Sequence, residues 1–192
     1  MRNIIFLIGR SGTGKSTLEF NLLKKHPAEF HRIMSYATRS PRPGEKDGEV
    51  YHFITQEEFL KMRTEFIQET HFAGNSYATK KADYLVNKPF TLFAVVPSQA
   101  VIMKKIIEEN FSDTKVRIVY FDISLERIKS NFLSRGETEE GFLKRMSKDN
   151  IEEEMKTLNL PVDYRVKDED LKPELDSIFY EYIKANWVWF FI

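Results

Sequence analysis

Cysteine is absent from this chain of 192 residues, and so is any long apolar run. Without cysteine the chain cannot form disulfides, thiol nucleophiles or cysteine-ligated zinc sites. No apolar stretch approaches the roughly 20 residues that span a bilayer, so we expect no membrane partner. An excess of one charge is missing too, because 29 basic residues balance 29 acidic ones. Proteins that bind duplex nucleic acid usually carry a basic excess, so we expect no nucleic-acid partner either.

What the chain does contain indicates an ordinary globular domain. Hydrophobic residues make up 42% of it, and a chain of this size can bury about 70% of its unfolded surface on folding. Neither end resembles a targeting signal, so we expect a cytoplasmic protein. The aromatic C-terminal stretch, residues 187–192, is expected to pack on its own domain, with contact to a second subunit as the alternative.

Short apolar runs alternate with helical patterns along most of the chain. Strands buried on both faces are predicted at residues 4–8, 90–96 and 116–121, with a further possible strand at 33–36. Helices are predicted at residues 16–25, 98–109, 125–133, 139–158 and 173–184. This alternation predicts an α/β fold in which helices cover both faces of a parallel sheet.

The alternation stops between residues 37 and 88. Proline and glycine punctuate residues 41–48, and Thr55 and Glu58 form a capping box that predicts a short helix. Residues 65–68 and 75–79 resemble a small antiparallel pair around Gly74. We therefore expect a small mixed β/α subdomain inserted between strands of the main sheet.

A phosphate-binding loop is the clearest motif in the sequence. Residues 9–16 are GRSGTGKS and match G-x-x-x-x-G-K-S between a predicted buried strand and a predicted helix. Glycines let successive N–H groups converge on one anion, Lys15 would reach the β- and γ-phosphates, and the Ser16 hydroxyl would bind Mg²⁺. The predicted ATP-binding residues are Gly9, Ser11, Gly12, Thr13, Gly14, Lys15, Ser16 and Thr17.

Beyond this loop the sequence resembles the guanylate kinase family. The resemblance rests on SYATRSPRPGE at residues 35–45, Gly48 and Tyr51, GNSYAT at 74–79, SRGETEE at 134–140, KR at 144–145 and DY at 163–164. It implies a P-loop nucleoside monophosphate kinase that uses ATP and Mg²⁺ to phosphorylate GMP or dGMP. It also implies a core at 1–36, 89–128 and 146–192, a monophosphate-binding subdomain at 37–88 and a helical lid at about 129–145.

The resemblance assigns roles to individual side chains. Arg39, Arg42, Tyr51 and Tyr77 match the residues that hold the acceptor phosphate, and guanidinium forks suit that task because they bind phosphate bidentately. Ser35, Gln68 and Thr79 stand at positions that contact the base. The implied catalytic residues are Lys15, Arg42, Arg135 and Arg145.

Several positions depart from the family pattern. Gln68 and Pro97 stand where the family has a glutamate and an aspartate that face guanine, and Val95 replaces another acid. Glu69 is adjacent to Gln68, but a shift of one residue turns a strand side chain to the opposite face unless a bulge intervenes. On the ATP side, Asn131 replaces an arginine and Asp168 an asparagine.

These departures leave the acceptor open. A kinase for another nucleotide or a phosphorylated sugar remains an alternative, as does a catalytically weak binding module on the same fold. The sequence is compatible with a monomer or a homodimer.

Overall fold

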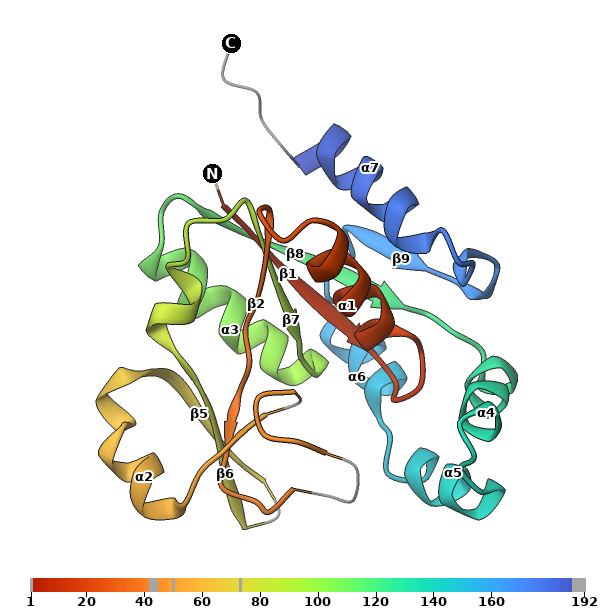
Figure 1. Cartoon of the computed structure of the whole chain (residues 1–192), viewed down its shortest axis with the longest axis horizontal. Helices are drawn as coiled ribbons and strands as arrows, with labels where there is room; N and C mark the ends of the chain where they lie inside the picture. The colour runs from red at the N-terminus through yellow and green to blue at the C-terminus, as the bar shows by residue number, and fades with distance from the viewer. Residues whose placement is uncertain (1, 42–44, 50, 73, 188–192) are drawn as a thin grey trace.

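The core of the protein is one parallel sheet. The computed structural model describes residues 2–41, 45–49, 51–72 and 74–187. Five strands pair in parallel in the order β2-β7-β1-β8-β9 (Figure 1). Their bounds are β1 Arg2–Gly9, β2 Phe30–Arg32, β7 Phe90–Ala94, β8 Thr114–Phe121 and β9 Tyr164–Val166.

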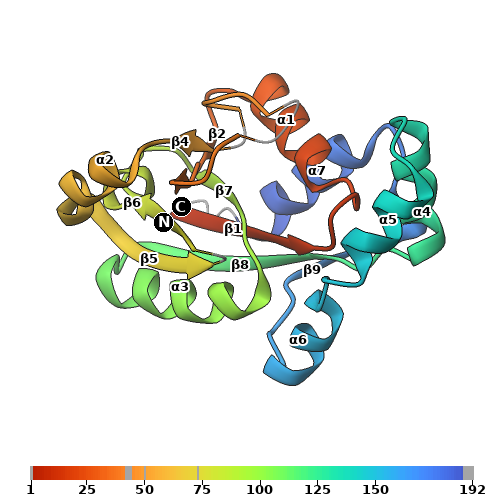
Figure 2. The same ribbon diagram turned by 90° about the horizontal axis from the view of Figure 1, so that it is seen from below.

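Helices cover both faces of this sheet, as the alternating pattern predicts. The α-helices are α1 Lys15–Lys25, α2 Gln56–Lys61, α3 Pro97–Asn110, α4 Leu125–Ser134, α5 Glu139–Met146, α6 Ile151–Leu158 and α7 Leu175–Trp187. Figure 2 shows α1 and α7 on one side of the sheet and α3 and α6 on the other. Side chains of β1 alternate between the two cores: Ile5 and Leu7 pack with α1 and α7, whereas Phe6 packs with α3.

A second, smaller sheet lies between β2 and β7 in the sequence. Its order is β4-β3-β6-β5, and it mixes parallel and antiparallel pairs. Its strands are β3 Tyr36–Ala37, β4 His52–Phe53, β5 Phe66–Phe72 and β6 Asn75–Lys80. Outside the two sheets, short 3₁₀ helices span Arg63–Glu65, Lys81–Tyr84 and Asp168–Asp170. The predicted antiparallel pair is β5 and β6, and the predicted capping box at Thr55 and Glu58 begins α2.

Two predicted elements are wrong. Residues 33–36 are not one strand: β2 ends at Arg32 in the main sheet, and β3 begins at Tyr36 in the small sheet. The helix expected at 139–158 is divided in two: α5 ends at Met146 and α6 begins at Ile151, whose amide donates to Asp149 Oδ1 (3.2 Å). The strand β9 is not among the predicted elements.

The last helix is longer than expected and ends on a buried aromatic side chain. Trp187 is 4% exposed and packs edge-on against Phe179 and Tyr182. The rest of the aromatic tail, residues 188–192, lies outside the described residues. Within the described part of the chain, no helix has both the length and the apolar character needed to cross a bilayer.

Candidate active site

The glycine-rich loop joins the central strand β1 to α1 at the carboxyl end of the sheet, where α/β proteins commonly bind ligands. Gly12 has φ +85° and packs against the ring of Phe132 in α4. The Asn131 Nδ2 atom donates to the Gly12 carbonyl oxygen (2.9 Å). The loop is therefore held against the second half of α4, which belongs to the predicted lid.

Lys15 is folded over the loop. Its Nζ atom donates to the carbonyl oxygens of Gly9 (2.6 Å) and Arg10 (2.7 Å). Burial lowers the pKa of Lys15 to about 8, although Asp149 and Glu19 oppose the shift. The Nζ atom also lies 3.4 Å from Thr13 Oγ1. A partly buried ammonium whose hydrogen-bond partners are all neutral oxygens gains from an added anion, so this position favours a bound phosphate.

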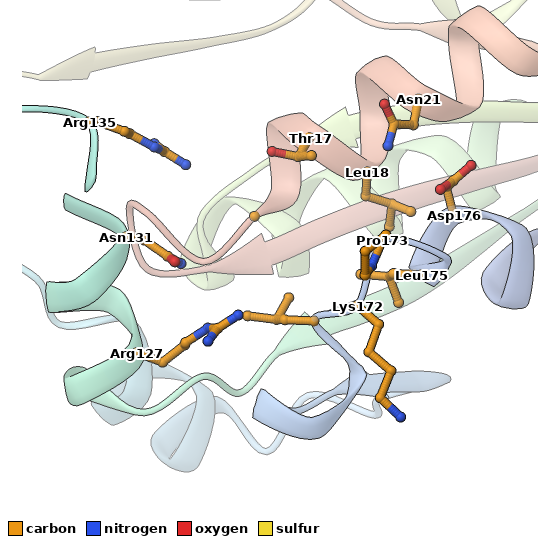
Figure 3. A pocket seen from close by; sticks show the side chains of 12 residues that line it. Thr17, Leu18, Asn21, Arg127, Asn131, Arg135, Lys172, Pro173, Leu175 and Asp176 are labelled. Atoms are coloured by element: carbon orange, nitrogen blue, oxygen red, sulfur yellow. The ribbon is translucent and has the colours of Figure 1, made fainter. Parts of the chain in front are cut away.

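A cavity of about 210 Å³ opens beside the loop on the α4 side. In Figure 3, Arg127, Asn131 and Arg135 form one wall of this cavity. Thr17 of α1 and Pro173, just before α7, lie across from them. Cationic side chains and an apolar floor together suit a flat base attached to a chain of phosphates.

The predicted lid residues occupy different positions. Arg145 lies at the loop itself: its Nη1 atom donates to Ser11 Oγ (3.2 Å), and its guanidinium stacks over the Phe132 ring at 4.9 Å. Arg135 lines the cavity of Figure 3 without touching the loop. Of the predicted loop residues, Thr13 is buried, whereas Ser16 and Thr17 are exposed at the start of α1.

A second cavity, of about 240 Å³, lies between the two sheets. Five of the predicted monophosphate-binding residues line it: Ser35, Tyr51, Gln68, Tyr77 and Thr79. The Thr79 hydroxyl is hydrogen-bonded to the Tyr84 hydroxyl (2.9 Å). The small sheet thus places one face of β6, and Gln68 of β5, against the carboxyl end of β7.

Arg39 lies near this cavity and is paired. Both of its Nη atoms donate to the Glu45 carboxylate, at 2.6 and 2.9 Å. Its guanidinium also stacks on the rings of Tyr51 and Phe53, at 5.0 and 5.1 Å. Arg42 lies outside the described residues. Glu45 therefore occupies the side of Arg39 that would bind a phosphate.

The base-facing positions show why Glu69 does not replace Gln68. The register of β5 against β6 shifts between Phe66 and Gln68, so the bulge precedes Gln68 and leaves Gln68 opposite Thr79. Glu69 points to the other face, where it pairs with Arg63 (2.8 Å). Pro97 is the first residue of α3, and its side chain has no polar atom.

Some residues that line the two cavities were missed from the sequence. Thr70 lies two residues after Gln68 and therefore shares its strand face, and Gln99 lies in the first turn of α3. In the cavity beside the loop, Asn21 and Asp176 were missed. Asp168, in contrast, accepts from the Ser124 amide (2.9 Å) at the start of α4 and lies apart from that cavity.

Fold and site together define a P-loop α/β protein with one cavity beside the phosphate loop and another facing the inserted sheet. The family model described as guanylate kinase matches residues 1–179. The chain belongs to the guanylate kinase family.

Individual relatives agree with this assignment. The chain is 30% identical over 178 residues to a guanylate kinase of Nostoc sp. (strain PCC 7120), covering 91% of this chain and 86% of that protein. It is 34% identical over 151 residues to a human guanylate kinase, covering 74% and 73%. The crystal structure of guanylate kinase from Anaplasma phagocytophilum shares the fold, with a TM-score of 0.60 at 23% identity over 96% of this chain and 85% of that one.

Proposed function

We propose that this protein is an ATP-dependent nucleoside monophosphate kinase that phosphorylates GMP. One observation carries the proposal: an intact phosphate loop, with Lys15 poised on it, lies beside one cavity, while a second cavity is lined by Tyr51 and Tyr77. The relatives named guanylate kinase support GMP as the acceptor. We expect the protein to act in the cytoplasm. Because one chain supplies both cavities, either a monomer or a homodimer could carry out the reaction.

The donor half of the site would hold ATP by its phosphates. The loop amides and the amino-terminal end of α1 would bind the β- and γ-phosphates, and Lys15 would leave its two carbonyl partners to join them. Asn131 and Pro173 line the cavity that would receive the base. These contacts would fix the γ-phosphorus in position for transfer.

Magnesium fits the donor half through Ser16. The Ser16 hydroxyl is exposed in the first turn of α1, and no group of three or more metal-binding His, Asp or Glu side chains occurs among the described residues. Mg²⁺ commonly takes one or two protein ligands and completes its shell with phosphate oxygens and water. When bound, the ion would neutralise charge on the β- and γ-phosphates.

The acceptor half would hold GMP by its phosphate. Arg39, Arg42, Tyr51 and Tyr77 would bind it, and the phosphate would compete with Glu45 for Arg39. An acceptor phosphate oxygen would form the new P–O bond as the bond between the γ-phosphorus and the β-phosphate oxygen breaks. The attacking oxygen of the acceptor phosphate is already anionic, so no general base is needed.

Arginines near the loop would stabilise the transferring group. Arg145 already contacts Ser11, and Arg135 lines the donor cavity, so both could place charge on the equatorial oxygens of the γ-phosphate. We propose that residues 129–145 act as a lid and residues 37–88 as the monophosphate-binding subdomain. The core comprises 1–36, 89–128 and 146–192.

A coupled assay of ADP release with ATP, Mg²⁺ and GMP tests the proposal. Lys15→Ala should abolish turnover, since it removes the cation of the loop. Lys24→Ala is the matched control, because Lys24 is an exposed lysine on the same helix and should leave the rate unchanged. Full activity in Lys15→Ala, or no turnover of any monophosphate by protein that binds ATP, would refute the kinase.

A further inference from the structure

Two amide side chains in the cavity between the sheets have fixed orientations. The Gln68 Nε2 atom donates to the Glu69 carbonyl oxygen (3.0 Å), to Thr70 Oγ1 and to Gln99 Oε1 (2.8 Å). Because a backbone carbonyl can only accept, the nitrogen of Gln68 must face it. The Gln99 oxygen also accepts from Thr70 Oγ1 (3.0 Å), so the nitrogen of Gln99 must face away from Gln68.

The two amides of this network leave one acceptor and one donor for a ligand, beside the hydroxyl groups of the Ser, Thr and Tyr side chains that also line the cavity. Gln68 Oε1 and Gln99 Nε2 have no hydrogen-bond partner within the described residues, and both side chains line the cavity. No aspartate or glutamate lines it among those residues. The adjacent carboxylate, Glu69, is held on the opposite strand face by Arg63. The polar groups available to a base in this cavity are therefore neutral.

Neutral amides recognise less of guanine than a carboxylate does. Along its Watson–Crick edge guanine presents one acceptor, O6, and two neighbouring donors, N1–H and the 2-amino group. A carboxylate has two oxygens and can accept from both donors, whereas Gln68 offers a single oxygen because its nitrogen is turned away. One acceptor and one donor match N1–H and O6, the pair that guanine shares with hypoxanthine.

We propose that this site recognises 6-oxopurines through Gln68 Oε1 and Gln99 Nε2 without recognising the 2-amino group, and that the protein phosphorylates IMP as well as GMP. The inference rests on the proposed kinase function. The reaction is the same for both acceptors: the γ-phosphoryl group passes to the acceptor phosphate, giving ADP together with GDP from GMP or IDP from IMP.

The expected selectivity follows from what hypoxanthine leaves unpaired. In a site with a carboxylate, removal of the 2-amino group strands a desolvated charged acceptor, which costs roughly tenfold or more in affinity. Here that acceptor does not exist. The ratio of kcat/KM for GMP to that for IMP should therefore lie below about ten.

The test measures this ratio in the wild type, in Gln68→Glu and in Glu69→Gln. Gln68→Glu should raise it at least tenfold, through a change in KM for the monophosphates while KM for ATP stays constant. Glu69→Gln exchanges the same functional groups on the opposite strand face, so it should leave the ratio unchanged. Gln99→Leu should lower kcat/KM for both substrates alike, because both lose the donor to O6.

Each outcome has a defined consequence. A wild-type preference for GMP above tenfold, or a ratio that Gln68→Glu leaves unchanged, would overturn the inference while the kinase function stands. Turnover of neither GMP nor IMP would refute the proposed function itself. An equal response to Gln68→Glu and Glu69→Gln would show that general charge, rather than contact with the base, sets the ratio, and would also overturn the inference.

Discussion

Replacing Gly12 by alanine would test whether the phosphate loop is shaped by its contact with α4. A Cβ atom on this residue would lie 2.8 Å from Phe132 Cδ2, closer still to Cε2, and 3.3 Å from Ile128 Cγ2. Carbon atoms ordinarily approach to about 3.5–4.0 Å. Phe132 and Ile128 are fully buried, so neither side chain has open space to move into.

Two terms contribute to the expected loss of stability. The backbone at Gly12 has φ +85°, which costs a residue with a side chain about 1–2 kcal/mol. Crowding against the buried ring adds about 1–3 kcal/mol. Gly74 separates the two terms, because it has φ +77° with nothing within 4 Å of an added Cβ. Gly74→Ala should therefore lose only the backbone term.

Urea unfolding of the wild type and the two variants would measure the difference, and titration with ATP would measure its effect on the site. Gly12→Ala should be less stable than Gly74→Ala by about 1–3 kcal/mol and should bind ATP more weakly. Gly74→Ala should bind ATP as the wild type does. Equal losses of stability, or unchanged ATP binding by Gly12→Ala, would refute the role assigned to the contact with Phe132.

Three further predictions concern charged side chains. Burial lowers the pKa of Lys15 from 10.5 to about 8, so the unfolded chain holds this proton at pH values where the folded chain has lost it. The difference in the free energy of unfolding between the wild type and Lys15→Met should therefore rise by up to about 3 kcal/mol between pH 8 and 10.5 in urea titrations. A difference that stays constant with pH would contradict the lowered pKa. Lys25→Met removes the 2.6 Å partner of Asp176, a carboxylate that is 1% exposed, and should cost about 1–3 kcal/mol in the same assay. An unchanged midpoint and slope would show that the ion pair contributes nothing. Arg145→Lys keeps the charge near Ser11 but loses the guanidinium fork, so kcat should fall about 10–100-fold with less than about a threefold change in ATP affinity; a purely binding defect would exclude a role in transfer.

Elements whose structure depends on local pattern could be predicted from the sequence. The apolar run of β1 and the loop that follows it required only hydrophobicity and spacing. The division of residues 33–36 between two sheets required knowledge of partners. The Ile33 amide donates to the Leu92 carbonyl oxygen (2.9 Å) in the main sheet, whereas Tyr36 pairs with Ala78 in the small one. Nothing in the run itself marks where the chain changes sheets.

The break between α5 and α6 leaves a mark in the sequence. Phe142 and Met146 are four residues apart, and so are Ile151 and Met155, but five residues separate Met146 from Ile151. At about 100° per residue the two pairs would lie on opposite faces of one continuous helix, so this spacing does not support residues 139–158 as a unit. Between the two helices, Asp149 accepts a hydrogen bond from the Ile151 amide and pairs with Arg10 of the phosphate loop (3.4 Å).

The candidate site divides along the same line. The residues expected to hold phosphates belong to motifs with fixed spacing, and their roles stay predictions. Family spacing also placed Gln68 toward the base, and Gln68 does line the cavity. Strand alternation alone could not choose between Gln68 and Glu69, because the bulge after Phe66 decides which of them faces the cavity. The bulge leaves the Gln68 amide inside the cavity and the Glu69 carboxylate outside it, so only the amide can contact a base there. Phosphate contacts supply binding energy that any monophosphate shares, and selectivity among bases must come from the few groups at the other end of the cavity. With the carboxylate excluded, the strand register of β5 becomes the feature that determines which purine this kinase accepts.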